Sequence, residues 1–416
     1  MTLSNEIYSI ELLLITPRKA GLLSRTSGLY IETTEELQQF MDQARKDGRY
    51  GIDLEFIRER TFFPKLALVQ IAVGESYRLI DPLSSVSLDP LLETVSDESI
   101  VKIVHAGGQD MEILELESKQ IPTNIFDTQI AAAFLGLGLQ PAYAATCERI
   151  LGIVVQKGES WTDWLQRPLT ENQEIYAIDD VRHLLPLHDH LTKALEKEQR
   201  SEWALAEMGK YSTPDFYHPP LSHCLKKVKK AGSLDSRGQG VLGELYLWRE
   251  QEARDQDRPR RRILADEIMV EIARRGPRQQ EALDKMRGLD GRDSRRYGRS
   301  ILSSIEKGLG IPESDLVFIH KKRRLEPEEE AALELGAAAL RSLCRGERIA
   351  PPLAGNNADV EHLIRAHFDK VTDSTDVKLL KGWRGELFGK KIIRFLTGEL
   401  VLRIDPESGY PRLLES

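Results

Sequence analysis

The sequence predicts a mixed α/β domain in about the first 200 residues, followed by a helical remainder. Strand-like apolar runs separated by short turns follow one another before residue 110. Beyond about residue 240, apolar residues recur instead every three or four positions, which is the spacing of one helix face. The length of 416 residues allows two to three domains of about 150 residues each. The apolar share of 41% is that of a globular protein.

Four strands are expected in the α/β part. The short connections between the first three favour hairpins, so these strands should be antiparallel neighbours. One helix precedes the four strands, and another follows them after Gly107-Gly108. We expect the strands at 50–56, 66–73, 77–80 and 100–105, and the two helices at 35–47 and 109–117.

Two later helices complete this part. Asp127-Thr128 can cap a helix that runs through Phe134, because their side-chain oxygens accept backbone N–H groups. The last helix is expected from about Thr170 to Ala194. The α/β domain is therefore expected to occupy residues 1–215.

A segment rich in proline, glycine and lysine follows, and it predicts a basic linker over 216–238. Helical domains are then expected over 239–315 and 325–416. An internal match supports a relationship between these two. Tyr297-Gly298-Arg299 and Phe388-Gly389-Lys390 lie 91 positions apart and are followed by apolar residues at the same spacing.

Charge is distributed unevenly along the chain. The net charge of −8 is made up of −14 for residues 1–220, +7 for residues 221–310 and −1 for the rest. An acidic block joined to a basic block is typical of a metal-dependent enzyme with an appended region that binds a polyanion. Solvated helices with uneven charge are the alternative that composition leaves open.

Cysteine content and hydropathy exclude several further classes of protein. The three cysteines lie far apart, which excludes a disulfide scaffold and a clustered zinc site and favours a reducing cytoplasm. No run approaches the ~20 apolar residues of a membrane helix. The start of the chain carries Glu6 and Glu11 and no basic stretch, so we expect no secretory signal.

The most informative acidic pair is Asp53 and Glu55. Residues two apart on a strand share a face, so both carboxylates point one way while Ile52 and Leu54 point into a core. Adjacent acids on one face repel each other. Either a basic partner, such as Arg58 or the nearby Arg60, or a cation bound between them would relieve this conflict.

Three further residues attract attention. Tyr176 and Asp180 are four apart on the predicted last helix and therefore share a face. Asp110 lies near a helix start. Each also has an ordinary structural interpretation. Asp110 can interact favourably with the helix dipole, and Tyr176 can be a packing aromatic.

Several motifs in this sequence resemble those of the ribonuclease D family. Asp53-Leu54-Glu55-Phe56, with Leu68-Val69-Gln70, is similar to the first exonuclease motif of that family. His105 to Asp110 resembles the second motif, and Tyr176-x-x-x-Asp180-Val181, preceded by 164–170, resembles the third. Residues 236–310 resemble a helicase-and-RNase-D C-terminal (HRDC) domain, and the last 90 or so residues look like a more divergent copy.

The resemblance implies an RNase H-like (DnaQ-like) fold and 3′→5′ exonucleolysis with two divalent ions, Mg²⁺ or Mn²⁺, about 3.5–4 Å apart. It assigns catalytic or metal-binding roles to Asp53, Glu55, Asp110, Tyr176 and Asp180. Asp53 would bridge both ions, Glu55 and Asp180 would complete one, and Asp110 would hold the other. Tyr176 would orient the attacking water, and the products would be nucleoside 5′-monophosphates.

The expected substrate is RNA, with tRNA precursors and other structured 3′ ends the leading candidates by resemblance. Arginine clusters at 258–262 and 292–299, with Lys226 to Lys230, fit backbone contacts that tolerate any base sequence. Interleaved acids also allow an ordinary solvated surface. Two other functions stay open at this point, namely a DNA 3′→5′ exonuclease and a non-catalytic nucleic-acid-binding protein on a nuclease fold.

Overall fold

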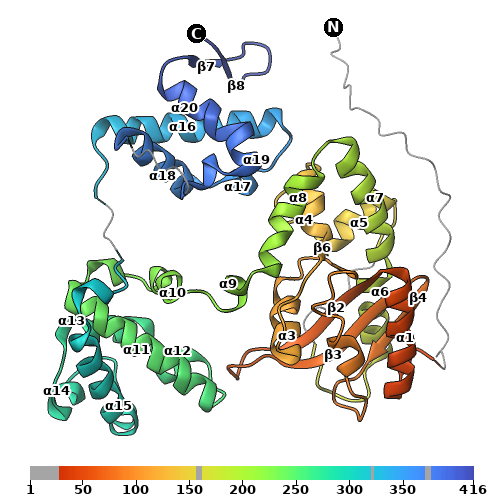
Figure 1. Ribbon diagram of the computed structural model, residues 1–416, viewed down its shortest axis with the longest axis horizontal. Helices are drawn as coiled ribbons and strands as arrows, with labels where there is room; N and C mark the ends of the chain where they lie inside the picture. The colour runs from red at the N-terminus through yellow and green to blue at the C-terminus, as the bar shows by residue number, and fades with distance from the viewer. Residues whose placement is uncertain (1–27, 156–161, 320–322, 371–375) are drawn as a thin grey trace.

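The computed structural model describes residues 28–155, 162–319, 323–370 and 376–416 (Figure 1). Its first part is built on a six-stranded mixed sheet with the order β1-β4-β3-β2-β5-β6. The strands β2, β3 and β4 are antiparallel neighbours, as the hairpin spacings predict. The outer strands β1, β5 and β6 each run parallel to their neighbour. The strands are β1 (Tyr30–Ile31), β2 (Arg49–Ile57), β3 (Lys65–Val73), β4 (Ser76–Ile80), β5 (Val101–Val104) and β6 (Ile125–Asp127).

Helices cover both faces of the sheet, and the alternation of side chains along β2 and β3 decides which core each residue enters. Ile52 and Ile71 are buried on one face, together with residues of α1 and α3. Leu68 and Leu79 are buried on the other face, against Ala177 of α6. The helices of this part are α1 (Thr34–Asp47), α2 (Asp89–Leu92), α3 (Gly108–Ser118), α4 (Thr128–Phe134), α5 (Tyr143–Leu151), α6 (Glu171–Arg182), α7 (Leu184–Lys197) and α8 (Ser201–Met208).

The single helix predicted from Thr170 to Ala194 is wrong, because the structure has two helices there, α6 and α7, with a break at His183. The reason is Pro186 in the first turn of α7. Proline has no N–H to donate to the carbonyl of Arg182, and its ring clashes with that carbonyl in a continuous helix. The break lets α7 leave the direction of α6.

The middle helical domain, defined here as residues 221–319, contains α10 (Leu221–Lys227), α11 (Ser236–Asp255), α12 (Arg260–Ile263), α13 (Asp266–Arg275), α14 (Gln280–Asp284) and α15 (Gly291–Gly310). The stretch predicted as a basic linker over 216–238 is not an open linker. It forms α9 (Pro214–Tyr217), α10 and the start of α11. Leu225, Val228 and Leu234 are buried in the same core as α11 and α15, while the lysines between them are exposed. Apolar side chains spaced regularly among the lysines therefore anchor the segment in this core.

The C-terminal domain, defined here as residues 327–415, contains α16 (Pro327–Gly346), α17 (Pro351–Ala354), α18 (Asn357–Phe368), α19 (Gly382–Arg384) and α20 (Lys390–Leu396). It also carries a hairpin of β7 (Leu400–Ile404) and β8 (Pro411–Glu415), which corrects the expectation of an all-helical remainder. Each strand of this hairpin has only five residues. Such a short stretch of alternating side chains does not distinguish a strand from the end of a helix in the sequence. Three matched pairs of the 91-residue repeat are buried in both copies, namely Tyr297 and Phe388, Gly298 and Gly389, and Ile301 and Ile392. The proposed domain boundaries, and the relationship of this domain to the middle one, stay predictions.

Both helical domains contact the α/β domain. The Asp257 carboxylate accepts hydrogen bonds from the backbone N–H groups of Phe62 and Phe63, each at 3.0 Å. In the C-terminal domain, Trp383 packs edge-on against Phe134 of α4, with ring centroids 5.0 Å apart. The chain thus folds back so that its last domain shares an apolar core with its first.

Candidate active site

Two acidic side chains stand on β2, one of the two central strands of the sheet. Asp53 and Glu55 lie opposite Gln70 and Leu68 of β3 and therefore project from the face that α6 covers. Ile52 and Leu54 point to the opposite core, as the alternation predicts. A register irregularity follows directly between Glu55 and Phe56. It ends the regular ladder beside the two carboxylates.

Gly51 determines how closely the helices approach this strand. It lies two residues before Asp53 on the same face, and α7 begins directly over it. A Cβ atom at Gly51 would stand 3.0 Å from Leu185 Cδ1 and 3.1 Å from Leu184 Cβ, which is tighter than ordinary contact. The absence of a side chain thus allows the α6–α7 junction to rest on β2. Asp180 is four residues before Leu184 and is carried toward Asp53 by this approach.

The structure brings three of the predicted residues into one group. Carboxylate oxygens of Asp53, Glu55 and Asp180 all lie within 4.8 Å of one another. Tyr176 lies one turn before Asp180 on α6, and its hydroxyl lies close enough to the Asp180 carboxylate for each group to affect the pKa of the other. Its ring is tilted against Trp164, with centroids 5.9 Å apart. The phenol is held by packing while its hydroxyl faces the acids.

Asp110 reaches the same region from the first turn of α3. It is 7% exposed and is not among the three acids whose oxygens cluster within 4.8 Å. The preceding loop is fixed by Asp127, which accepts hydrogen bonds from the Ala106 N–H at 3.0 Å and from the Tyr211 hydroxyl at 2.8 Å. Ala106 itself has a φ of 59°. A specific loop conformation therefore places Asp110 beside the cluster.

The four acids are crowded carboxyls that are partly or wholly removed from solvent. Burial raises the pKa of Asp53 to about 7. Burial, reinforced by the charge of Asp53, raises the pKa of Glu55 to about 8. Burial and then the charges of Asp53 and Glu55 raise the pKa of Asp180 to about 9. The pKa of Asp110 also lies well above its usual value, because of burial first and then the neighbouring acids.

A basic partner does not relieve this crowding. Arg58, one of the two arginines considered from the sequence, binds Glu112 instead at 2.8 Å, and Arg60 is exposed. Within the part of the chain that the structure describes, the three clustered acids form no ion pair with lysine, arginine or histidine. Grouped carboxylate oxygens are the ligands that hard divalent cations prefer. The donor set therefore fits a Mg²⁺ or Mn²⁺ site.

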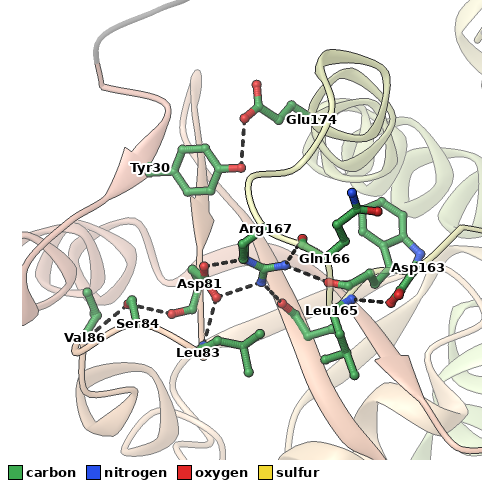
Figure 2. A network of polar contacts seen from close by, with 12 residues as sticks. Tyr30, Asp81, Leu83, Ser84, Val86, Asp163, Leu165, Gln166, Arg167 and Glu174 are labelled. Carbon is green, nitrogen blue, oxygen red and sulfur yellow. Dashed lines mark hydrogen bonds and ion pairs between the residues drawn. The ribbon is translucent and has the colours of Figure 1, made fainter.

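An arginine fixes the segment that leads into α6 (Figure 2). The Arg167 guanidinium donates to both carboxylate oxygens of Asp81, at the end of β4, at 2.5 and 2.7 Å. It also donates to the carbonyl oxygens of Ala67 on β3 and of Trp164. Nearby, the Tyr30 hydroxyl donates to Glu174 of α6 at 3.0 Å. We call the Arg167–Asp81 contact the clamp, since it holds the start of α6 against the sheet.

Polar residues in the predicted motifs that are not ligands have structural roles. Both ring nitrogens of His105 lie 2.9 Å from protein oxygens, those of Thr128 and Pro141. Asp127 caps α4, as expected from the sequence. Asp163 accepts a hydrogen bond from the Leu165 N–H within its loop.

Sequence reasoning gave no role to Gly51 or to Arg167, although both precede predicted site residues by a short distance. The available signals were a glycine inside a strand and an arginine in a motif before a helix.

Comparisons with known proteins agree with this geometry. A family model described as 3′-5′ exonuclease matches residues 29–196, and one described as HRDC domain matches residues 238–305. The fold and the acidic site thus define an exonuclease of the RNase H-like class, followed by an HRDC domain.

Relatives of similar length identify one family within this class of exonucleases. The chain is 32% identical to ribonuclease D of Gluconacetobacter diazotrophicus over 377 residues, covering 90% of this chain and 94% of that protein. It is 34% identical to ribonuclease D of Nitrobacter hamburgensis, covering 90% and 97%. The crystal structure of Escherichia coli RNase D, described as an exoribonuclease involved in structured RNA processing, superposes with a TM-score of 0.75. It is 30% identical, and the match covers 89% of this chain and 98% of that one.

The chain belongs to the ribonuclease D family, and it is a hydrolase of the 3′→5′ exoribonuclease type. Divalent metal use and RNA as the substrate class follow from this membership. No helix in the described residues is both long and apolar enough to span a membrane.

Proposed function

We propose that this protein trims the 3′ ends of tRNA precursors and other structured RNAs, releasing nucleoside 5′-monophosphates with the help of two Mg²⁺ or Mn²⁺ ions. The observation that carries the proposal is the half-buried carboxylate cluster of Asp53, Glu55 and Asp180, which lacks a basic partner among the described residues. The relationship to an RNase D described as acting in structured RNA processing supports the substrate class.

The five predicted residues divide into ligands and one orienting group. Asp53 would contact both ions, with Glu55 and Asp180 completing one of them. Asp110, buried beside the cluster but outside the 4.8 Å group, would serve the other ion. When bound, two such ions activate water and stabilise the leaving oxygen of a phosphodiester. Tyr176 would orient the water, since a phenol hydroxyl both donates and accepts hydrogen bonds.

The partial burial of these acids explains why the site would bind a cation. Each carboxyl has a raised pKa in the absence of positive charge, so its ionised form is costly there. Divalent cations remove that cost by binding the ionised form. The cluster is therefore arranged for a cation and destabilised without one.

Basic residues of the middle helical domain support RNA as the substrate. A cavity of about 600 Å³ lies between the loop at Phe62 and the middle helical domain, and Arg254, Arg260 and Lys227 are among its lining residues. Arg261 and the neighbouring Arg262 are exposed on the same domain. Such groups contact phosphates without reading bases. We also propose a cytoplasmic location, where tRNA precursors are processed, supported by three free cysteines.

The experiment compares Asp53→Asn and Asp180→Asn with the parent on a 3′-labelled tRNA precursor in Mg²⁺. Both substitutions are expected to abolish release of mononucleotides, because a neutral amide is a poor ligand for a hard cation. Asp179→Asn is the matched control, since Asp179 is paired with Arg182 at 3.0 Å on the same helix. Equal activity of all variants would refute the assigned site.

A DNA exonuclease is the second candidate, because this chemistry does not depend on the 2′-hydroxyl. Competition between labelled RNA and DNA of the same sequence separates the two functions. Preferential degradation of RNA is expected. A non-catalytic binding protein would release no nucleotide from either substrate, with any metal.

A further inference from the structure

One buried polar side chain next to the site is not used by the proposed chemistry. Gln70 is fully buried in β3, a strand whose other residues from Leu66 to Val73 are all apolar. Neither its amide nitrogen nor its amide oxygen has a hydrogen-bond partner. A buried amide without partners is costly, and a methionine or leucine at this position would avoid that cost. The amide therefore calls for a partner that becomes available in a functional state.

The sheet register identifies where that partner lies. Gln70 stands directly opposite Asp53 in the β2–β3 ladder. Directly opposed residues of an antiparallel pair project from the same face, with Cβ atoms about 4.5–5.5 Å apart. Both side chains therefore leave the sheet side by side, toward α6.

The apolar neighbours on this face cannot satisfy the amide. Along β3 they are Leu68 and Ala72, and across the next ladder Gln70 faces Leu79 of β4. Ala177 of α6 is buried over the same patch. All of these side chains are apolar. The polar side chain directly opposite Gln70 is Asp53, and Glu55, two positions further along β2 on the same face, lies diagonally from it.

We propose that Gln70 is a positioning residue, whose amide N–H donates to the Asp53 carboxylate and fixes its rotation when that carboxylate binds a divalent cation. The inference rests on the proposed metal site. An ionised carboxylate offers about four acceptor positions, and a cation occupies only the outward ones. A hydrogen-bond donor on the side of the carboxylate away from the cation orients the carboxylate and increases its affinity for the metal. Loss of such a supporting hydrogen bond typically weakens metal binding about 10- to 100-fold.

Binding of Mn²⁺ to the full chain, measured by the electron paramagnetic resonance signal of the free ion, tests this role without reference to activity. Gln70→Met, which preserves length and removes the amide, is expected to weaken Mn²⁺ binding about 10-fold. Its metal-free melting temperature should equal or exceed that of the parent. Gln70→Leu is the second variant in case methionine packs poorly. Thr192→Val is the matched control, because the Thr192 hydroxyl is also buried without a partner but lies on α7.

The outcomes separate this inference from the proposed function. If the parent binds no Mn²⁺, or if Asp53→Asn binds it as well as the parent, the metal site itself is wrong. If Asp53→Asn loses binding while both Gln70 variants retain the parent affinity, the site stands and the positioning role is overturned. As a second readout, the side-chain amide resonance of Gln70, assigned by its loss in Gln70→Met, should shift on adding Mg²⁺ to the parent. A resonance that does not move contradicts the inference.

Discussion

The guanidinium of Arg167 binds both carboxylate oxygens of Asp81, a residue 86 positions earlier in the chain. The contact joins the end of β4 to the segment before α6, and α6 carries Tyr176 and Asp180. A salt bridge at the end of β4 thus anchors the segment that leads into the helix of two proposed catalytic groups. Its guanidinium also satisfies carbonyl groups of β3 and of the lead-in segment, so the clamp is more than a surface pair.

Replacing Arg167 with lysine tests the clamp. Lysine keeps the charge but cannot form the forked, multi-donor contact. We expect a loss of about 1–3 kcal/mol in the free energy of unfolding, and a larger fall in turnover than in RNA affinity. Thermal denaturation and steady-state kinetics measure both. Arg394→Lys, at an exposed ion pair with Glu415, is the control and should change neither. An Arg167→Lys enzyme with parental turnover would show that α6 is held by packing alone.

A methyl group at Gly51 is predicted to disturb the site through α7. Gly51→Ala places the new Cβ about 3.0 Å from Leu185, so the α6–α7 junction must move away from β2. Overpacking of this kind costs about 1–3 kcal/mol of stability. Weaker Mn²⁺ binding should accompany it, because Asp180 moves with the junction. At Gly209 a Cβ would meet no atom within 4 Å, so Gly209→Ala should leave both quantities unchanged.

Stability of the metal-free protein should depend on pH in a defined direction. The folded-state pKa values of Asp53, Glu55 and Asp180 are raised to about 7, 8 and 9, above the ordinary values of 3.8 and 4.5. The folded state therefore binds protons more tightly than the unfolded chain. The stabilisation that these protons provide is complete below about pH 4 and is lost as the pH rises toward 9.

Divalent cations should reverse this dependence, because they bind the ionised carboxylates. We expect Mn²⁺ to raise the melting temperature more at pH 8.5 than at pH 6, as measured by thermal denaturation with EDTA or with Mn²⁺. In the double variant Asp53→Asn, Asp180→Asn the difference between the two pH values should shrink. A metal-induced shift that is the same at both pH values in the parent would contradict the role of these acids.

Tyr176→Phe separates water orientation from metal binding. The ring keeps its contact with Trp164, and the hydroxyl beside Asp180 is removed. We expect turnover to fall on the order of 10- to 100-fold, as it does when a reacting group is misplaced by about 1 Å. Mn²⁺ affinity should change little. An unaltered rate under single-turnover conditions would exclude the orienting role.

Exposed arginines of the middle helical domain are expected to contribute charge rather than specificity. Replacing Arg261 and Arg262 with alanine should weaken RNA binding equally for unrelated sequences. Each lost phosphate contact reduces the slope of log K against log salt by about 1. Fluorescence anisotropy between 50 and 200 mM salt measures this slope. A slope identical to that of the parent would place the RNA elsewhere.

Much of the α/β domain was predictable because alternation and short turns are local signals. The strand positions of Asp53 and Glu55, and the shared helix face of Tyr176 and Asp180, follow from residue spacing alone. What could not follow is how closely these elements approach. The closeness of this approach depends on Gly51, and the sequence does not indicate that α7 packs against that residue.

Other features were missed for different physical reasons. The break before α7 was readable from Pro186, but the apolar pattern on both sides of it is continuous. The buried residues of the predicted linker are spaced three apart among lysines. The high charge of the segment therefore hid its apolar helical spacing in the sequence. Whether Asp110 completes the cluster depends on the loop fixed by Asp127 and Tyr211, a contact across 84 positions of the chain that has no signature in the sequence.

The contact of Trp383 with Phe134 has a practical consequence for anyone wishing to shorten this protein. An isolated nuclease fragment ending before residue 320 would present Phe134 and Trp203 to water where the indole of Trp383 now covers them. It would also leave Glu207 without the arginine it binds, Arg384. Such a fragment would tend to self-associate. A minimal catalytic unit should therefore be obtained by redesigning that bare surface, rather than by trimming alone.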